Sequence, residues 1–281
     1  NITPYLLEIA LLYIVESLTY VYNLCIEQNI FPTALKNAKV VPLPKTNDLS
    51  DPSNYRPISL LPVISKPLER HIHKHLLQYL ENNKLIHQYQ SGFRPDHSCH
   101  TALTRLCDGR LSAMNSSEIV GTVFLDFKKL FDFVDHSILL KKLSLYVKDS
   151  SSLAFLHSYL TNRSQSVFLN NKSSSKGLVR YGVPQGSVLG PLLFCIFIND
   201  LPLHISNDKV SNDLFADDSS LHTRGKNIQL VEMSLQRSLN KVADWCGSNS
   251  MIMHPAKTKG MVIATRQKHQ LSPLQLTLTI E

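Results

Sequence analysis

The chain has 281 residues, of which 43% are hydrophobic, so it can bury a sizeable core as one large domain or two subdomains. Lys and Arg outnumber Asp and Glu by 29 to 22, which gives a net charge of +7 with neutral histidines and suits a polyanionic partner. The five cysteines show no CxxC pair and no regular spacing. This pattern excludes a disulfide framework and a zinc site, and it indicates free intracellular thiols.

Thr3-Pro4 reads as a helix N-cap followed by proline in the first turn. Apolar residues then recur at helical spacing, which predicts one or two amphipathic helices up to about Gln28 with a packing role. Glu8 and Glu16 interrupt this stretch and argue against a transmembrane span. The chain begins with Asn1 and ends in a strand-like segment, so we expect a piece of a longer polypeptide without a signal peptide.

Residues 38–113 alternate between extended and helical patterns. Strand-like runs cover 38–43 and 55–62, and a polar loop covers 48–54. Helices are predicted over 65–82 and 98–113, with the loop Gln90-Ser91-Gly92-Phe93-Arg94-Pro95 before the second.

The run from Glu118 to Asp126 is apolar and rich in β-branched residues, and it ends in a carboxylate. It predicts a buried strand that delivers Asp126 at its C-terminal edge. Asp132 and Asp135 then suit the N-terminus of a following helix, where the helix dipole favours negative charge.

The central part of the chain predicts a helix over 152–160 and strands over 166–170 and 176–182. A glycine- and proline-rich loop, Gly182-Val183-Pro184-Gln185-Gly186-Ser187-Val188-Leu189-Gly190-Pro191, leads into a buried helix over 189–201. A further amphipathic helix is predicted over 227–247.

Asp217 and Asp218 stand between two short strand-like runs, Leu214-Phe215-Ala216 and Ser219-Ser220-Leu221, which together predict a hairpin. An isolated pair of this kind is most often a solvated turn. Asp126 at a strand end changes that interpretation, because three such carboxylates suit a site for two divalent cations about 3.5–4 Å apart.

These stretches together resemble the palm of a reverse transcriptase, and the motifs from Phe31 to Ala264 resemble, in order, those of non-LTR (LINE-type) retrotransposon reverse transcriptases. The resemblance implies an α+β right-hand polymerase fold with an antiparallel palm sheet backed by helices, and a thumb that is missing or truncated. It implies a helical lead-in over 1–30, a reverse transcriptase domain over 31–265 and the start of a C-terminal extension over 266–281. Fingers would lie mainly in 31–115 and palm mainly in 116–265.

The resemblance also implies roles for individual residues. Asp126, Asp217 and Asp218 would hold two Mg²⁺ ions, with Mn²⁺ as a substitute, and Lys257 would protonate the pyrophosphate leaving group. Phe131 would favour dNTPs by excluding a ribose 2′-hydroxyl, although a core position is the alternative. The remaining implied contacts to dNTP or template are Lys45, Arg56, Arg94, Phe127, Gln185, Gly186, Phe215 and Ala216. For Lys45, Arg56 and Arg94, exposed surface cations are the alternative.

The implied function is RNA-directed DNA polymerisation with an RNA template, a DNA primer and dNTPs as partners and no membrane, inside the nucleus or cytoplasm as a ribonucleoprotein. The oligomeric state stays open. Two alternatives remain: a catalytically inactive or repurposed nucleic-acid-binding copy, and an RNA-directed RNA polymerase. Leu130, Phe133 and His254 depart from the family pattern and favour the first alternative; Phe131 argues against the second.

Overall fold

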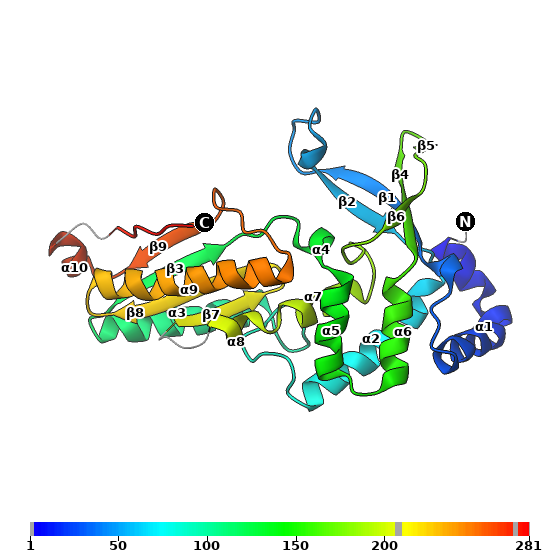
Figure 1. Cartoon of the computed structure of the whole chain (residues 1–281), viewed down its shortest axis with the longest axis horizontal. Coiled ribbons are helices and arrows are strands. Elements are labelled where there is room, and N and C mark those ends of the chain that lie inside the picture. Colours follow the sequence, from blue (N-terminus) through cyan, green and yellow to red (C-terminus); the bar gives the residue numbers. More distant parts are fainter. Residues whose placement is uncertain (1–2, 206–209, 272–274, 281) are drawn as a thin grey trace. The chain divides into compact units, whose positions relative to one another are not determined.

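The computed structural model describes residues 3–205, 210–271 and 275–280, and the chain divides into two compact units (Figure 1). The first unit takes Asn1–Leu85 and Phe131–Phe197, and the second takes Ile86–Leu130 and Ile198–Glu281. Each unit is therefore discontinuous in sequence. Residues 86–115 belong to the unit that carries Asp126, whereas the assignment of fingers and palm to particular boundaries stays a prediction.

The first unit contains a mixed sheet. Its strands are β1 (Asn37–Pro44), β2 (Tyr55–Leu60), β4 (Arg163–Leu169), β5 (Lys172–Ser173) and β6 (Gly177–Val179). The strand order is β2-β1-β4-β5, and β6 also pairs with β4. The pairing of β1 with β4 is parallel and brings together segments more than 120 residues apart in the chain, whereas the other pairings are antiparallel.

The first unit also contains helices. They are α1 (Pro4–Glu27), α2 (Ser65–Asn82), α5 (His136–Tyr146) and α6 (Ser150–Leu160), with α4 (Leu130–Phe133) and α7 (Gly190–Ile198) at the unit's boundaries and the 3₁₀ turns η1 (Thr33–Leu35) and η2 (Pro52–Asn54). Asp135 and Asp149 cap α5 and α6 by accepting hydrogen bonds from backbone N–H groups of the first turn. The helix predicted over 189–201 is instead two helices, because α7 ends at Ile198 and α8 (Leu201–Ile205) begins after Asn199 and Asp200.

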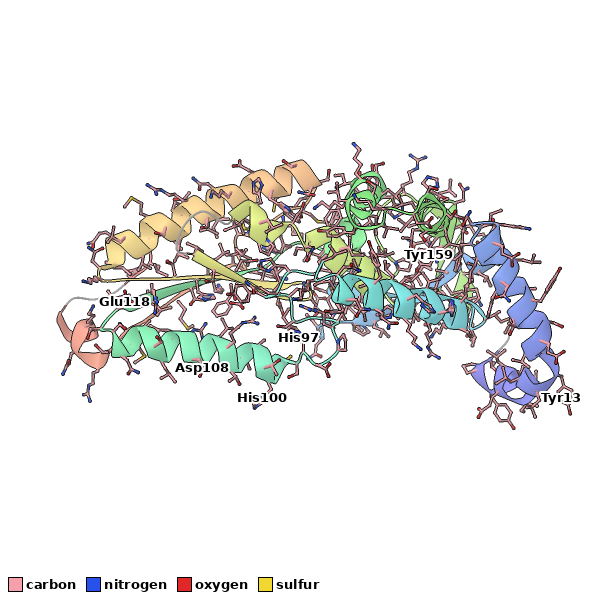
Figure 2. All side chains as sticks on the ribbon, turned by 90° about the horizontal axis from the view of Figure 1, so that it is seen from below. Tyr13, His97, His100, Asp108, Glu118 and Tyr159 are labelled. Carbon is pink, nitrogen blue, oxygen red and sulfur yellow. The ribbon has the colours of Figure 1, made fainter. Side chains whose placement is uncertain are left out.

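Helix α1 forms where predicted, with the Thr3 hydroxyl accepting a hydrogen bond from Leu6 N–H at 3.2 Å. The expected packing role is wrong for most of its length, because Cys25 is its one buried residue among those described. Tyr13 is 87% exposed and projects away from the ribbon in Figure 2. By length and hydropathy, α1 is the one described helix that could cross a bilayer, although a core helix or a signal sequence would meet the same criteria.

The second unit contains an antiparallel sheet in the order β7-β8-β3-β9. The strands are β7 (Val210–Phe215), β8 (Asp218–Gly225), β3 (Ile119–Leu125) and β9 (Lys259–Ile263). Helices α9 (Ile228–Asn249) and α3 (Cys99–Asn115) cover opposite faces of this sheet (Figures 1 and 2), and α8 and α10 (Arg266–Leu271) complete the unit. The antiparallel sheet backed by helices confirms the predicted α+β class.

Local sequence signals explain the helix starts in this unit. Ser98 and Thr101 form a reciprocal capping box at α3, and the Asn227 side chain accepts a hydrogen bond from Leu230 N–H at α9. The strand-like C-terminal segment does not form a strand over 275–280. Instead, Thr277 N–H and Thr279 N–H donate to side chains of α9, namely Glu232 and Gln236, each at 2.8 Å.

Candidate catalytic site

Asp126 and the 217/218 pair meet at one end of the second unit's sheet. Strand β3 pairs with β8 so that Leu125, the last residue of β3, lies opposite Ser219. Asp126 directly follows Leu125, and Asp218, the first residue of β8, directly precedes Ser219. The site therefore arises from two adjacent strands whose neighbouring ends both carry acid. This is the convergence that the sequence predicted.

The pKa of Asp218 reflects the proximity of the three carboxylates. The pKa of Asp218 is raised above its usual range, first by partial burial and then by the negative charges of Asp217 and Asp126. Three carboxylates that repel one another gain from a divalent cation, and carboxylate oxygen is the ligand that Mg²⁺ prefers. Among the described residues, no three His, Cys, Asp or Glu side chains are already gathered around a point where a metal ion would bind. The ligand chemistry fits, and the side chains would have to turn toward the ion.

The hairpin that carries Asp217 has a two-residue turn. Phe215 pairs with Asp218, so that the turn consists of Ala216 and Asp217, and Ala216 adopts the left-handed conformation with φ of 58°. This conformation costs an L-residue roughly 1–3 kcal/mol unless surrounding contacts fix it. Ala216 is buried, so those contacts are available.

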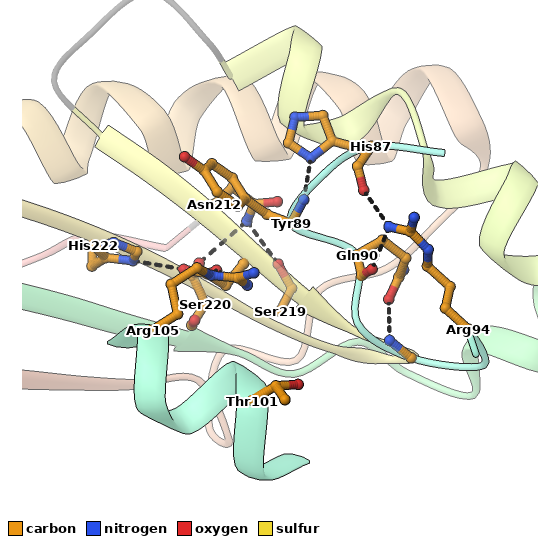
Figure 3. A network of polar contacts seen from close by, with 12 residues as sticks. His87, Tyr89, Gln90, Arg94, Thr101, Arg105, Asn212, Ser219, Ser220 and His222 are labelled. Carbon is orange, nitrogen blue, oxygen red and sulfur yellow. Dashed lines mark hydrogen bonds and ion pairs between the residues drawn. The ribbon is translucent and has the colours of Figure 1, made fainter. Parts of the chain in front are cut away.

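The loop from Gln90 to Pro95 supplies the contacts that hold the turn. Gln90 is fully buried, and its Oε1 accepts hydrogen bonds from Gly92 N–H at 2.8 Å and from Ala216 N–H at 3.2 Å (Figure 3). Ser91 N–H also donates to Leu214 O at 2.8 Å. A Cβ atom at Gly92 would lie 2.1 Å from the backbone nitrogen of Ala216, so only glycine fits there.

Gln90 is thus a site residue that the sequence analysis missed. The feature of the sequence that could have identified Gln90 is its position at the start of the Gln90–Pro95 loop. In that loop, only Arg94 was predicted to contact the template. Arg94 Nη1 donates to the carbonyls of His87 and Gln90 at 3.2 and 3.0 Å, which closes the loop on itself (Figure 3).

The segment around Lys257 lies against the strand end that bears Asp126. His254 N–H donates to Asp126 O at 2.7 Å, and Asp126 N–H donates to the Thr258 hydroxyl at 3.4 Å. Lys257 is exposed in the turn between these two anchors. The Nδ1 atom of His254 is buried without a hydrogen-bond partner.

Two expected substrate contacts in this unit are less accessible than the sequence suggested. The Phe127 side chain is buried, and its backbone bridges to Met253. Phe215 is half-buried. Their roles at the site therefore run through backbone placement of the neighbouring aspartates.

The remaining predicted residues lie in the first unit. Lys45 and Arg56 are both exposed, at the end of the β1–β2 hairpin where the connecting loop joins the two strands. Leu43 pairs with Arg56, and Lys45 N–H donates to Asn54 O at 2.7 Å, so Lys45 and Arg56 point to the same face. Two cations on one face of a hairpin suit a polyphosphate.

The glycine- and proline-rich loop is tied to β2. Gln185 O accepts a hydrogen bond from Ser59 N–H at 2.7 Å, and its side-chain Nε2 donates to Asp132 at 3.0 Å. Gly186 has φ of +119°, and a Cβ atom there would lie 2.6 Å from Ser59 O. The close approach expected of Gly186 is thus to a protein strand. Phe131 is half-buried, and its ring lies 4.7 Å from that of Phe194.

Comparison with known proteins decides the family. Residues 43–277 match the family of reverse transcriptases (RNA-dependent DNA polymerases). The chain belongs to the reverse transcriptase family. The match runs further toward the C-terminus than the resemblance noted in the sequence, which ended at Ala264.

Mobile-element polymerases are among the relatives of this reverse transcriptase. It is 32% identical to the RNA-directed DNA polymerase from mobile element jockey of Drosophila melanogaster, over 89% of this chain and 28% of the relative. It is also 32% identical to the probable RNA-directed DNA polymerase from transposon BS of the same organism, over 94% of this chain and 29% of the relative. The inferred resemblance to non-LTR retrotransposon enzymes is confirmed, and the chain spans less than a third of those relatives' length.

Solved structures show the same fold. Apo telomerase from Candida tropicalis, truncated from its C-terminal domain, matches with a TM-score of 0.59 and 13% identity, over 83% of this chain and 51% of the other. Telomerase from Candida albicans, in complex with a fragment of telomeric RNA, matches with a TM-score of 0.60 and 15% identity, over 89% of this chain and 46% of the other. The right-hand polymerase fold predicted from sequence is confirmed.

Proposed function

We propose that this reverse transcriptase adds dNTPs to the 3′-hydroxyl of a primer on an RNA template, as part of a retrotransposon protein that acts inside the cell as a ribonucleoprotein. Family membership supports the reaction class. The observation that carries the site is the adjacency of Asp126 and Asp218 at neighbouring strand ends, where the negative charge of Asp126 helps to raise the pKa of Asp218.

The carboxylates of Asp126, Asp217 and Asp218 would hold two Mg²⁺ ions. When bound, such ions supply Lewis-acid activation of the attacking oxygen and neutralisation of the leaving group. The chain's own task is then positioning, since phosphoryl transfer asks little covalent chemistry of the protein. Strands β3 and β8 fix the backbone of the aspartates, and Gln90 fixes the turn between Phe215 and Asp218.

Other residues would handle the substrate. Lys45 and Arg56, exposed on one face of their hairpin, would bind the phosphates of the dNTP, Arg56 through its planar fork. Lys257, exposed in the turn anchored to Asp126, would give a proton to pyrophosphate. Phe131 would disfavour ribonucleotides.

The test is primer extension on poly(rA)/oligo(dT) with Mg²⁺ and wild-type protein. We expect Asp217→Asn to lower the rate by about a thousandfold or more, since a metal ion's Lewis-acid effect is worth several kcal/mol. Asp108→Asn is the matched control, because Asp108 is exposed on α3 of the same unit (Figure 2). Extension that survives Asp217→Asn would refute the site.

An inactive copy is the second candidate. Leu130 is buried and Phe133 is 38% exposed, so packing accommodates both departures from the family pattern. The unpartnered Nδ1 of His254, next to Asp126, is the observation that favours inactivity. Wild-type protein that binds an RNA–DNA hybrid without extending it would establish this candidate. Preference for rNTPs over dNTPs would instead indicate an RNA polymerase.

A further inference from the structure

The first unit contains a hollow of about 220 Å³ among β1, β2, β4 and the loop that precedes α7. Two cations in its wall are nearly fully buried: Lys36 is 4% exposed and Arg163 is 1% exposed. Buried charges in proteins are ordinarily paired or bound to a ligand, because removing an ion from water costs several kcal/mol. Within the described part of the chain, the structure shows no ion pair for either residue.

Arg163 is only partly satisfied by the protein. Its guanidinium lies over the Tyr159 ring, 4.7 Å from the centroid, and Nη1 donates to Tyr159 O at 2.8 Å. Nη2 is buried and has no hydrogen-bond partner. Because the fork of an arginine suits oxyanions, an unpartnered guanidinium nitrogen on a residue that lines a hollow indicates an anionic ligand.

Lys36 adds a second positive charge to the same hollow. Burial lowers its pKa first, and the nearby charge of Arg163 lowers it further. Two like charges that repel each other would both be stabilised by an anion between them. The lining also includes the carboxylate of Asp132, which accepts a hydrogen bond from Gln185 Nε2 at 3.0 Å.

We infer that this hollow binds one phosphate group of a nucleotide, with Arg163 Nη2 and Lys36 Nζ as donors. The volume is below the roughly 300–1,000 Å³ of sites that enclose a whole small molecule, so a single group is the fitting occupant. The inference rests on the proposed function only in naming a nucleotide as the source of the phosphate. That source is either a nucleic-acid backbone or a free dNTP.

In the test, Lys36 of the wild-type protein is labelled by brief reductive methylation with formaldehyde in the presence of EDTA. Peptide mass spectrometry measures the extent of methylation. At saturating inorganic phosphate we expect methylation of Lys36 to slow by about fivefold or more, by simple occupancy. Lys172, exposed on β5 of the same unit and outside the hollow, is the internal control and should react at an unchanged rate. Equal methylation of Lys36 with and without phosphate, oligo(dT) and dNTP would overturn the inference.

Variants assign the protection to the hollow. Arg163→Gln should abolish protection of Lys36, whereas Arg180→Gln, at an exposed arginine outside the lining, should retain it. Protection that persists in Arg163→Gln would overturn the inference. Should Arg163→Gln fail to fold, Arg163→Lys replaces it; this variant keeps the charge but lacks the fork, and we expect weaker protection.

The source of the phosphate follows from the effective ligand. Protection at a lower concentration of single-stranded oligo(dT) than of dNTP indicates a backbone phosphate, and the reverse order indicates the free nucleotide. In the first case, Lys36→Gln should reduce the slope of log binding constant against log salt by about 0.7, the contribution of one phosphate on a single strand. None of these readouts needs extension activity, so a failure of the proposed function would leave them interpretable.

Discussion

Ala216 sits in a conformation that L-residues rarely adopt, immediately before the Asp217 carboxylate. A buried carboxamide acceptor from Gln90 and the absence of a side chain at Gly92 make that conformation possible. The position of Asp217 therefore depends on a loop more than 120 residues earlier in the chain. Gln90 is a positioning residue, since it acts through Ala216.

Replacing Gln90 should impair catalysis more than substrate binding. We expect Gln90→Ala to lower kcat for primer extension by about 10–100-fold, the usual effect of losing a group that orients a metal ligand, and to raise the Mg²⁺ concentration required. KM for primer–template should change little. Steady-state kinetics with a Mg²⁺ titration measure these effects.

Gln88→Ala is the control for this prediction, because Gln88 is exposed and stands two residues before Gln90. Unchanged kcat in Gln90→Ala would show that the turn keeps its shape without the carboxamide.

At the scale of elements, helix α9 packs so closely on the second unit's sheet that a methyl group does not fit between them at Gly121. A Cβ atom at Gly121 in β3 would lie 2.4 Å from Val231 and 2.8 Å from Leu235 of α9. Glycine usually weakens a strand, so its presence here reflects the close approach of the helix. The same helix also binds the segment 275–280 through Glu232 and Gln236.

Two glycine substitutions in this unit should therefore change the free energy of unfolding in opposite directions. Gly121→Ala should reduce the free energy of unfolding by about 1–3 kcal/mol through overpacking. Gly109→Ala should increase it by roughly 0.5–1 kcal/mol, since Gly109 is in the exposed middle of α3 and a methyl group added there would meet nothing within 4 Å. Urea unfolding midpoints at constant slope measure both, and stabilisation by Gly121→Ala would contradict the packing argument.

At the scale of the whole molecule, the chain passes between its two units at residues 85–86, 130–131 and 197–198. Both units contain half-buried histidines: burial lowers the pKa of His73 and His136 in the first and of His87 and His222 in the second. His222 lies beside the buried Asp213, with Nδ1 and Oδ2 3.2 Å apart but not aligned as a hydrogen bond, and Arg105 completes this cluster (Figure 3). For His222, the positive charges of Arg110 and Arg105 lower the pKa further, and Asp213 opposes them.

The lowered pKa values of these histidines determine the direction in which the stability of the fold changes with pH. A histidine whose folded-state pKa is lowered binds fewer protons folded than unfolded, so acidification favours the unfolded chain. Stability should be fully present above the ordinary histidine pKa of about 6.5 and should fall as the pH drops from there toward the lower folded-state values. Urea midpoints at about pH 7.5 and 5.5 should show the loss, and His222→Gln should make it smaller. A midpoint that rises on acidification would contradict this assignment.

Local rules determined much of this protein from sequence alone. The bounds of α2, the negative charge of Asp135 at a helix start, the strand that leads to Asp126 and the aspartate turn all follow from periodicity and local preferences within a few residues. The order of the motifs sufficed to predict the family and the polymerase fold. The proximity of the three carboxylates was predictable because each is marked by its own strand end or turn.

Only the tertiary structure decided what depends on distant contacts. The support of Ala216 by Gln90, the burial of Lys36 beside Arg163, the exposure of α1 and the discontinuous units each require residues far apart in the chain to meet or fail to meet. Periodicity says which face of a segment is apolar, but it does not say which partner covers that face or whether one does. The physical reason is that strand pairing and packing partners are chosen by the whole folded chain, whereas caps and turns are chosen by their neighbours.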